Sequence, residues 1–453
     1  MRRLALVRSG LALTLGVVLA AAAPAQTRLP EPRPLGRGLS AFAAPSDPKE
    51  EPLPEAPAPA GVLRLPDALA AALLGSPDLA AHAYELRARE AQVLQAGRRP
   101  NPVLSAEVED VLGSGDFRSA GESQSMLQLG QLVELGGKRA ARVRLAAAEH
   151  ALAGWDYETR RIEVLTETVD AFIEVLAAQE RRRLAGEVLT VTEAIRRVAR
   201  RRVEAGLASP AEEIRAGVAV DSAGVEREHA DHELATARTA LAARWGGTEA
   251  RFERAEGDLA ALPAPPSLAE LQRRAAESPE LARWAAERES REAALARARS
   301  GRVPDVTIAA GPRYLAGSED ATLVLGASIP IPLWNRNDGA IAEARFRRAK
   351  AGLEQRAAEV RVATEISAAL IALHASTEEA ELLRTRVLPG IQRAIGVLQR
   401  GYEEGGSTQL EVLDAMRTRL AAQEQYLRAL VEAHHAARKL ERLTGAPLEE
   451  EKP

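Results

Sequence analysis

Apolar and polar residues alternate with a period of two in short stretches of both halves of the chain. In the second half the alternation covers residues 306–310 and 322–329, with the polar stretch AGSEDA between them. In the first half residues 124–133 alternate after the loop GSGDFRSAGES, and PNPVLSAEVEDV precedes that loop. Because successive side chains of a strand point to opposite faces, each half is predicted to form two strands joined by a hairpin loop. The apolar side is modest, which favours barrel strands over the strands of a sandwich core.

Alanine-rich, charged stretches with helical character fill most of the remaining chain. The pattern predicts a helix over 67–97 and a counterpart over 267–300. Residues 137–204 contain no proline, and at 1.5 Å per residue a helix of that length is a rod of about 100 Å. Each half then returns in a second helix. The outgoing helix of the second half begins at Gly339, and Pro389 within it is predicted to mark a kink or a restart.

The last return helix carries a heptad stripe of mostly apolar residues. The stripe consists of Leu413, Leu420 and Leu427 at one position and Met416, Gln423 and Leu430 at the other. Apolar residues at these two heptad positions predict a coiled-coil seam.

The two halves are related by an internal duplication. The stretch SPDL at 76–79 returns as SPEL at 278–281, an offset of 202. The same offset aligns Leu69 with Leu271, Glu85 with Glu287, Glu90 with Glu292, Pro102 with Pro304, and Gly137 with Gly339. A constant offset over this length indicates a duplicated structural unit. The predicted organisation is a first repeat over 61–250, a linker over 251–266, a second repeat over 267–445 and a C-terminal tail over 446–453.

The N-terminus has the pattern of an export signal. Three arginines precede the apolar stretch Leu11–Ala22, and Ala23-Pro24-Ala25 supplies the small residues of a cleavage site before Gln26. Residues 1–25 are therefore predicted to be a cleaved signal peptide; an N-terminal membrane anchor is the alternative, although the apolar stretch is short for a span. Residues 26–60 contain nine prolines and are predicted to form an extended, disordered leader. No later run is long and apolar enough to cross a bilayer as a helix.

Composition narrows the class of protein. Only 3% of the residues are aromatic while 46% are hydrophobic, which favours long, thin helix packing over a thick aromatic core. The chain has no cysteine, which excludes disulfides, thiolate metal sites, cysteine nucleophiles and an acylated N-terminal cysteine. Loss of the three signal arginines changes the formal charge from −4 to −7, so a nucleic-acid partner is not expected.

The predicted number of strands requires partners. Two strands in each half give four per chain, and four twisted strands cannot close on themselves, whereas an open edge cannot lie in lipid. Cyclic assembly of three such chains would supply twelve strands. The long helices would then continue from the barrel as a tube, and the duplication would make the trimer nearly six-fold.

Four segments resemble the TolC family of outer-membrane efflux ducts. They are PNPVLSAEVE, QLVELGGKRAAR, SIPIPLWNRNDGAIAEAR and GYEEGGSTQLEVLDA. The stretches ELGGKR and IPLWNRNDG are most similar to the CzcC-like branch, which serves heavy-metal and cation efflux. The resemblance implies a mainly α protein with a small β part. It further implies a homotrimer whose twelve-stranded transmembrane barrel continues into a helical barrel in the periplasm. The implied partners are outer-membrane lipid, a periplasmic adaptor and an inner-membrane pump of the resistance-nodulation-division class.

The two helix reversals match the family's tip motif, which contacts the adaptor. The tip residues are Gly206, Leu207, Ala208 and Ser209 in the first repeat and Gly405, Gly406, Ser407 and Thr408 in the second. A glycine suits a reversal because it can adopt positive φ, and Ser209 and Thr408 suit helix N-caps. The resemblance also implies that Glu212, Glu411 and Asp414 form acidic rings at the periplasmic aperture, with Tyr402 in the same network. Such rings favour cations.

Each second strand leads into a long helix through a glycine-containing turn. In the first repeat the turn residues are Gly136, Gly137, Lys138 and Arg139, and in the second they are Trp334, Asn335 and Gly339. The glycines permit a sharp turn, and Lys138, Arg139 and Arg142 are predicted to reach lipid headgroups, with Trp334 at the membrane interface. An ordinary polar turn is the alternative for the second site.

No residue pattern predicts catalysis, a cofactor or a metal site. His229 and His232 lie one helical turn apart without a third ligand, and His434 and His435 are adjacent, so both pairs are interpreted as solvated helix surface. Two other classes remain as alternatives. A periplasmic adaptor would have one helical hairpin rather than two, and an exported coiled-coil protein would not need the alternating strands.

Overall fold

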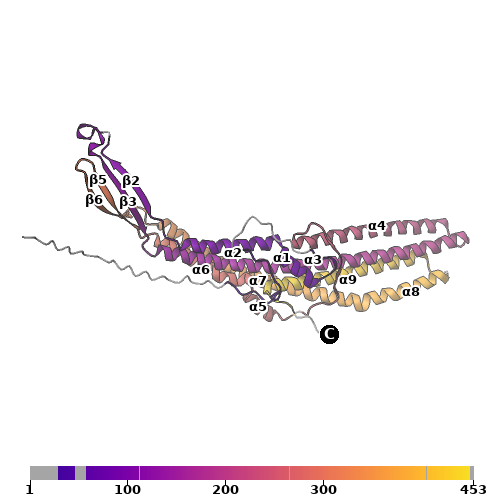
Figure 1. Cartoon of the computed structure of the whole chain (residues 1–453). Helices are drawn as coiled ribbons and strands as arrows, with labels where there is room; N and C mark the ends of the chain where they lie inside the picture. The colour runs from indigo at the N-terminus through magenta and orange to yellow at the C-terminus, as the bar shows by residue number, and fades with distance from the viewer. Residues whose placement is uncertain (1–28, 46–57, 112, 265, 405, 449–453) are drawn as a thin grey trace, which may run out of the picture.

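The computed structural model describes residues 29–45, 58–111, 113–264, 266–404 and 406–448. The molecule is long and narrow, with a small sheet at one end and helices along the rest of its length (Figure 1). The predicted signal peptide lies outside the described residues. Within the described part of the chain, no helix has an apolar run long enough to cross a membrane.

The sheet at the end of the molecule has four antiparallel strands in the order β2-β3-β5-β6. The strands are β2 (Val103–Glu109), β3 (Gln124–Val133), β5 (Val306–Leu315) and β6 (Asp320–Ser328). The two predicted hairpins are thus confirmed, and β3 and β5 join them with the register Gln124–Leu315 to Val133–Val306. Among the described residues, the outer edges of β2 and β6 pair with no other strand.

The register sorts apolar and polar residues onto opposite faces of this sheet. One cross-strand row runs Leu104, Leu129, Ala310, Leu325, and a row three residues further along the strands, on the other face, runs Glu107, Met126, Arg313, Thr322. Leu323 and Leu325 remain 71% and 74% exposed because no helix covers the apolar face. A sheet that is apolar on an uncovered face is suited to lipid rather than to water.

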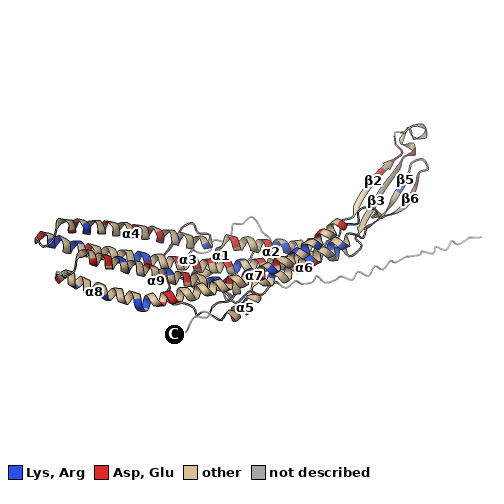
Figure 2. Ribbon diagram, turned by 180° about the vertical axis from the view of Figure 1, so that it is seen from behind, with Lys and Arg blue, Asp and Glu red and all other residues tan. Residues whose placement is uncertain are grey.

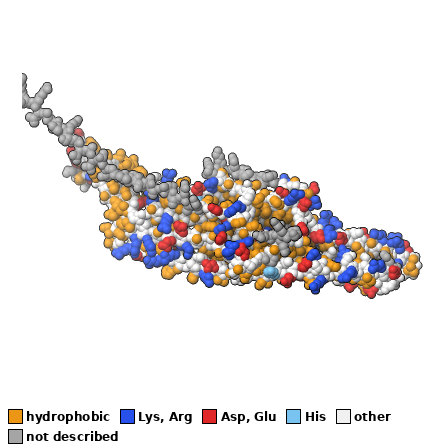
Figure 3. Space-filling view, turned by 90° about the horizontal axis from the view of Figure 1, so that it is seen from below, with side chains coloured by type: hydrophobic (Ala, Val, Ile, Leu, Met, Phe, Trp, Pro, Cys, Tyr) orange, Lys and Arg blue, Asp and Glu red, His pale blue; other side chains and the backbone are white. Residues whose placement is uncertain are grey.

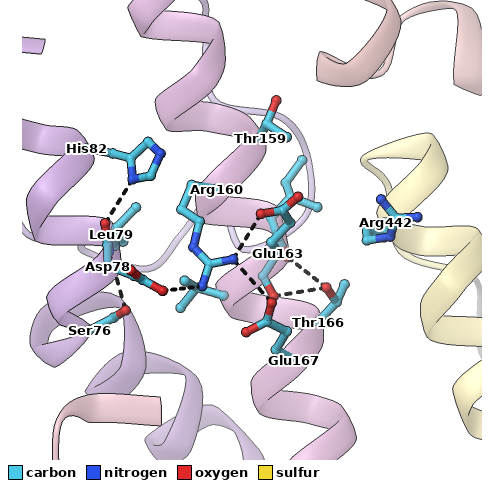
Figure 4. A network of polar contacts seen from close by, with 12 residues as sticks. Ser76, Asp78, Leu79, His82, Thr159, Arg160, Glu163, Thr166, Glu167 and Arg442 are labelled. Carbon is cyan, nitrogen blue, oxygen red and sulfur yellow. Dashed lines mark hydrogen bonds and ion pairs between the residues drawn. The ribbon is translucent and has the colours of Figure 1, made fainter. Parts of the chain in front are cut away.

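The helices of the first repeat begin with an unexpected break. The predicted helix over 67–97 is two helices, α1 (Leu65–Gly75) and α2 (Pro77–Ala96), because Ser76 is extended and its hydroxyl accepts the Leu79 amide. Pro77 at the first position of α2 has no N–H to lose there. The break places Asp78 at α2's first turn, where its carboxylate contacts Arg160 at 2.8 Å (Figure 4).

The second repeat has the same break at Ser278, between α5 (Leu268–Ala276) and α6 (Pro279–Ser300). The repeated SPDL and SPEL stretches are therefore two copies of one helix junction. A single helix was predicted in each half because the apolar pattern continues across the junction. That prediction was wrong, since the serine and the proline end one helix and begin the next.

The long helices agree with the sequence prediction in length and order. They are α3 (Lys138–Glu204), α4 (Pro210–Ala242), α7 (Asp338–Leu382), α8 (Leu388–Glu404) and α9 (Gln409–Thr444). A π-helical turn at Leu383–Val387 joins α7 to α8 immediately before Pro389. The wider turn accommodates a proline that cannot donate a helical hydrogen bond, so the discontinuity lies where Pro389 predicted it.

The helices form a layer whose order changes along the molecule. Near the sheet α2 packs on α3, α3 on α6, and α6 on α7. Farther away α4 packs on α3, α3 on α9, and α9 on α8. Leu427 and Leu430 of the heptad stripe are buried, and Leu413 and Met416 pack near Ile195, as a helix seam requires.

Two packed segments were missed or misread in the sequence. A parallel pair, β1 (Gly61–Arg64) and β4 (Phe252–Glu256), places a strand in the predicted linker; both strands are too short to show a period.

Residues 29–45, here called the strap, pack on α3 rather than being disordered. The Arg33 amide donates to Glu158 at 2.6 Å, and Phe42 is buried. Prolines reduced the entropy lost on ordering without preventing burial of the apolar residues between them.

Candidate functional site

The first helix reversal is a tight turn at the end of the molecule opposite the sheet (Figure 1). Gly206 has φ +71°, and the amides of Gly206 and Leu207 bond back to the carbonyls of Val203 and Arg202. This is the hydrogen-bond pattern that satisfies the last carbonyls of a helix through a residue with positive φ. Ser209 caps α4 by accepting the Ala211 amide at 3.3 Å, and Leu207 projects into solvent with Ala208 half-buried. The predicted positive φ and N-cap are present.

The second reversal lies at the same end. Gly405 is outside the described residues. The amides of Gly406 and Ser407 both bond to the Gly401 carbonyl, and Thr408 caps α9. Both tips therefore end in capped, solvent-exposed turns, which leaves their outer surfaces free for a partner.

Glu411 has a role within its own chain that differs from the predicted one. Its carboxylate accepts the Thr408 amide at 2.7 Å and the Thr408 hydroxyl at 2.9 Å, completing a capping box. These hydrogen bonds, from the backbone first, hold the pKa of Glu411 below its usual value. Asp414 is exposed and lies one turn further along α9. The Thr-x-x-Glu spacing could have revealed the box from sequence.

Tyr402 and Glu212 meet around an arginine that sequence reasoning missed. The Arg202 guanidinium lies 4.9 Å from the centre of the Tyr402 ring and donates to the Tyr402 carbonyl at 3.1 Å. Burial raises the pKa of Tyr402, Arg202 lowers it, and Glu212 raises it. Within the described residues, Arg202 Nε, Glu212 Oε2 and Tyr402 Oη are buried without hydrogen-bond partners. The cluster joins α3, α4 and α8 just behind the tips.

The first strand-to-helix turn is built from two consecutive glycines. Gly136 and Gly137 have φ of +65° and +71°. Lys138 pairs with Asp305 at 2.8 Å, and Arg142 pairs with Glu134 at 2.5 Å. Both cations are thus held by carboxylates beside the turn, and contact of Lys138 or Arg142 with headgroups stays a prediction. Arg139 has no such carboxylate among the described residues.

The second turn uses a different residue from the one aligned by the duplication. Asn337 has φ +60° and precedes α7, whereas Gly339 lies inside the first turn of that helix. The Asn335 side-chain oxygen Oδ1 accepts the Asn337 backbone amide at 3.1 Å. Trp334 is 92% exposed beside Ile331 and Leu333, which are also exposed. A bare tryptophan directly after the strands is the arrangement expected of a residue at a membrane interface.

The two histidine pairs lie in different surroundings, and His229 and His232 are exposed. Within the described residues, no group of three or more His, Asp or Glu side chains is placed to hold a metal ion. However, His434 and His435 are not solvated surface as predicted. His434 Nε2 lies 2.9 Å from the Leu259 carbonyl, and His435 lies between Asp170 at 2.9 Å and Glu174 at 3.1 Å.

The His435 contacts predict a pH-dependent stability. Asp170 and then Glu174 raise the pKa of His435 to about 9 from 6.5. The stabilisation is complete below about pH 6.5 and is lost as pH rises through about 9. After discounting for partial exposure, the free energy of unfolding should fall by about 1 kcal/mol more in the wild type than in His435→Gln between pH 7 and 10. Chemical denaturation in detergent measures this, with the exposed His374→Gln as control; equal pH slopes in His435→Gln and wild type would contradict it.

Comparison with known proteins gives a consistent family. The model of a family described as outer membrane efflux protein matches residues 68–247 and 271–446. The cobalt-zinc-cadmium resistance protein CzcC of Cupriavidus metallidurans is 34% identical over 386 residues, which cover 85% of this chain and 91% of that protein. A membrane protein from Pseudomonas aeruginosa has a similar fold, with a TM-score of 0.72, 21% identity and coverage of 86% and 91%. The channel-forming protein CusC gives a TM-score of 0.71, 17% identity and coverage of 84% and 92%.

Proposed function

The chain belongs to the outer membrane efflux protein family, and we propose that it forms the passive exit duct of a tripartite cation efflux system. It is located in the outer membrane, and its helices extend into the periplasm. In the proposed system an adaptor and an inner-membrane pump of the resistance-nodulation-division class deliver the substrate. The duct itself performs no catalysis and needs no cofactor.

The observation that carries this proposal is the four-stranded sheet with one apolar face and two free edges. In lipid each free backbone group costs several kcal/mol, about the strength of a lost hydrogen bond in an apolar medium, so the edges must pair. β2 and β6 run in opposite directions, since all three neighbouring pairs of strands in the sheet are antiparallel. The β6 edge of one copy can therefore pair antiparallel with the β2 edge of the next. Three copies close a barrel of twelve strands, with the polar rows lining the passage.

The outer helices of the layer carry exposed apolar stripes at two levels of the molecule below the sheet. On α7, Phe346, Leu353 and Val360 are exposed at intervals of seven residues, so they lie on one side of the helix. On α4, Ile214, Val218 and Val225 are exposed in a similar stripe. Both helices are at an edge of the layer. Exposed apolar stripes at an edge favour packing against another protein, which supports a neighbouring copy of this chain as the partner.

The tips support contact with the adaptor. Both reversals are short, capped and exposed at the end farthest from the membrane, and Leu207 offers an apolar side chain there. Buried polar atoms of Arg202, Glu212 and Tyr402, which have no hydrogen-bond partner in the part of the chain that the structure describes, lie just behind them. Buried polar groups usually have hydrogen-bond partners. Their lack in a single chain supports a region whose contacts are completed by assembly or by opening of the aperture.

We propose that Asp414 and Glu212 contribute charge at the aperture and that Glu411 contributes mainly helix capping. Glu411→Gln keeps the capping pattern, since glutamine also serves at that position, but removes the charge. Asp414→Asn should therefore weaken cation selectivity of the reconstituted channel several-fold, Glu411→Gln should change it less, and Glu411→Ala should lower the thermal stability because it removes the capping box. Bilayer reversal potentials and thermal unfolding measure the two effects. Unchanged selectivity in a Glu212→Gln, Asp414→Asn double variant would show that these acids are only solvated surface.

Cation efflux is tested in cells. The similarity to a protein named for cobalt, zinc and cadmium resistance supports these substrates. A strain without this chain should lose tolerance to these cations, and the wild-type chain should restore it. Gly206→Val should not restore it although it reaches the outer membrane, because a β-branched residue is strained at positive φ and distorts the tip. Full cation tolerance without the chain, together with lost tolerance to organic compounds, would assign another substrate.

A further inference from the structure

Several arginines at the membrane end of the helices lack carboxylate partners. Within the described residues, no acid lies within ion-pair distance of Arg139, Arg144, Arg299 or Arg345. Arg139 lies at the start of α3 and Arg299 at the end of α6, while Arg144 and Arg345 lie within two turns of a helix start. Two turns span about 11 Å, so all four lie close to the ends of the strands. Basic side chains gather at this end of the helical body (Figures 2 and 3).

Two of these arginines, Arg139 and Arg144, lie on the two flanks of α3 that the strap contacts. Arg144 precedes Trp155 by about three turns, and Arg139 precedes Tyr157 by about five, so each pair shares a side of α3. Trp155 contacts Arg33 of the strap, and the Tyr157 hydroxyl donates to the Phe42 carbonyl. A tube whose passage contained the strap would be obstructed. The strap side is therefore the outside, which faces the underside of the membrane around the barrel.

Three helices bring positive charge together on this outer side. Arg348 of α7 pairs with Glu292 of α6 at 2.8 Å. Arg348, Arg299 and Arg144 all favour the ionised form of Glu292, and the Arg348 hydrogen bond is the main reason that its pKa is lowered. Three guanidinium groups thus act electrostatically on one carboxylate, and only that of Arg348 pairs with it. Arg345 lies one turn before Arg348 on the same side of α7.

The opposite side of the same helices carries mostly paired cations. There a groove contains Lys138, Arg142, Arg291, Arg297 and Arg347, together with Glu134, Glu149 and Glu343. Lys138 pairs with Asp305, Arg142 with Glu134, Arg291 with Glu287, and Arg347 with Glu343, whereas Arg297 has no ion-pair partner among the described residues. Most cations on the passage side are therefore paired with acids, where bare arginines would repel a cationic substrate, whereas most of those outside are not. The difference in pairing between the two sides distinguishes the outer arginines from an end of the molecule that is basic all round.

We propose that Arg139, Arg144, Arg299, Arg345 and Arg348, here called the arginine rim, bind the phosphates of anionic phospholipids in the periplasmic leaflet. A headgroup region is about 5–7 Å deep, and arginine extends its charged end towards such a region while its stem packs on apolar atoms. Guanidinium groups bind phosphate through paired hydrogen bonds. Exposed Trp334 and Ile331 lie at the same level of the chain, directly after β6, and suit the apolar part of that interface. The inference rests on the proposed insertion of the sheet in the bilayer.

Native mass spectrometry of the detergent-solubilised protein with added lipid tests the rim. The wild type should retain phosphatidylglycerol more than phosphatidylcholine, increasingly so at low salt. The variant Arg144→Gln, Arg299→Gln, Arg345→Gln should bind phosphatidylglycerol between about tenfold and a hundredfold more weakly, since each basic residue near an anionic surface contributes roughly fivefold. The matched control is Arg196→Gln, Arg197→Gln, Arg400→Gln, three exposed arginines near the tips; it should bind as the wild type does.

The outcomes separate the rim from the duct. Oligomer size on native gels reports assembly, so a rim variant that keeps its oligomer but loses lipid supports the inference. Equal retention of phosphatidylglycerol by the rim variant and the control would overturn it. Displacement of the lipid by millimolar inorganic phosphate would also overturn it, because the site would then recognise free phosphate rather than a lipid surface. Retention of phosphatidylglycerol by the wild type, together with full cation tolerance in a strain without this chain, would leave the rim intact and count against the proposed function alone.

Discussion

Leu325→Arg is expected to prevent stable insertion in the outer membrane, while Val324→Arg on the same strand is tolerated. Leu325 lies near the middle of β6 on the apolar face, in the row with Ala310 and Leu129. Val324 points to the other face, opposite Gly311. An arginine on the lipid face near the bilayer midplane costs about 2–4 kcal/mol per chain. A trimer multiplies that cost by three, whereas an arginine in the aqueous passage remains hydrated.

Outer-membrane fractionation and heat-resistant oligomers on gels measure this difference. A second lipid-face substitution, Leu323→Arg, should behave as Leu325→Arg does, and Thr322→Arg should behave as Val324→Arg does. The opposite ranking, with Val324→Arg excluded from the membrane and Leu325→Arg accepted, would show that the polar rows face lipid.

Gly311→Ala is expected to disrupt the joint between the two repeats. A Cβ at Gly311 would fall on the Leu127 carbonyl oxygen and lie 2.6 Å from the Gln128 Cα, both of which are backbone atoms of β3. The strands must separate to admit it, and overpacking of that kind costs about 3 kcal/mol or more. Because β3 and β5 hold the first hairpin to the second, their separation exposes two more edges to lipid. We expect little or no assembled protein in the outer membrane.

Gly326→Ala is the matched control for that prediction. A Cβ there would meet only the Gln128 side-chain amide at 3.7 Å, an ordinary contact. Gly326 lies on the neighbouring strand, on the same face as Gly311. The two variants are compared by the yield of folded oligomer after extraction from the membrane. Equal yields would mean that β3 and β5 are not held together at Gly311 as tightly as described.

Periodicity predicted the parts of this fold that repeat regularly. The alternation at 124–133 and 322–329 fixed two strands closely, and the absence of proline from 137 to 204 gave α3 within a residue. Both signals are local, because they follow from the geometry of one strand or one helix. The duplication then supplied the corresponding elements of the other half.

The features that sequence missed depend on contacts between distant residues. Nothing local indicates that Arg202 lies over Tyr402, 200 positions later, or that Asp305 holds Lys138. The strap is a further case. Its prolines suggested disorder, but Phe42 packs on α2 and α3, and Leu35 packs on α1, α2 and α3. Alignment by the constant offset also failed locally: Gly339 matched Gly137 in letters, but Asn337 adopts the positive φ.

Cysteine cross-linking across the free edges tests the closed barrel most directly, and the chain contains no cysteine of its own. Ser105→Cys on β2 would be combined in turn with Thr322→Cys, Val324→Cys and Gly326→Cys on β6, all on the polar face. Disulfides require Cα atoms about 4.4–6.8 Å apart, a distance that only neighbouring strands reach. The account predicts covalent dimers and trimers, and nothing larger, for at least one double variant and none for any single variant. Monomers from every double variant, or dimers from Ser105→Cys alone, would contradict it.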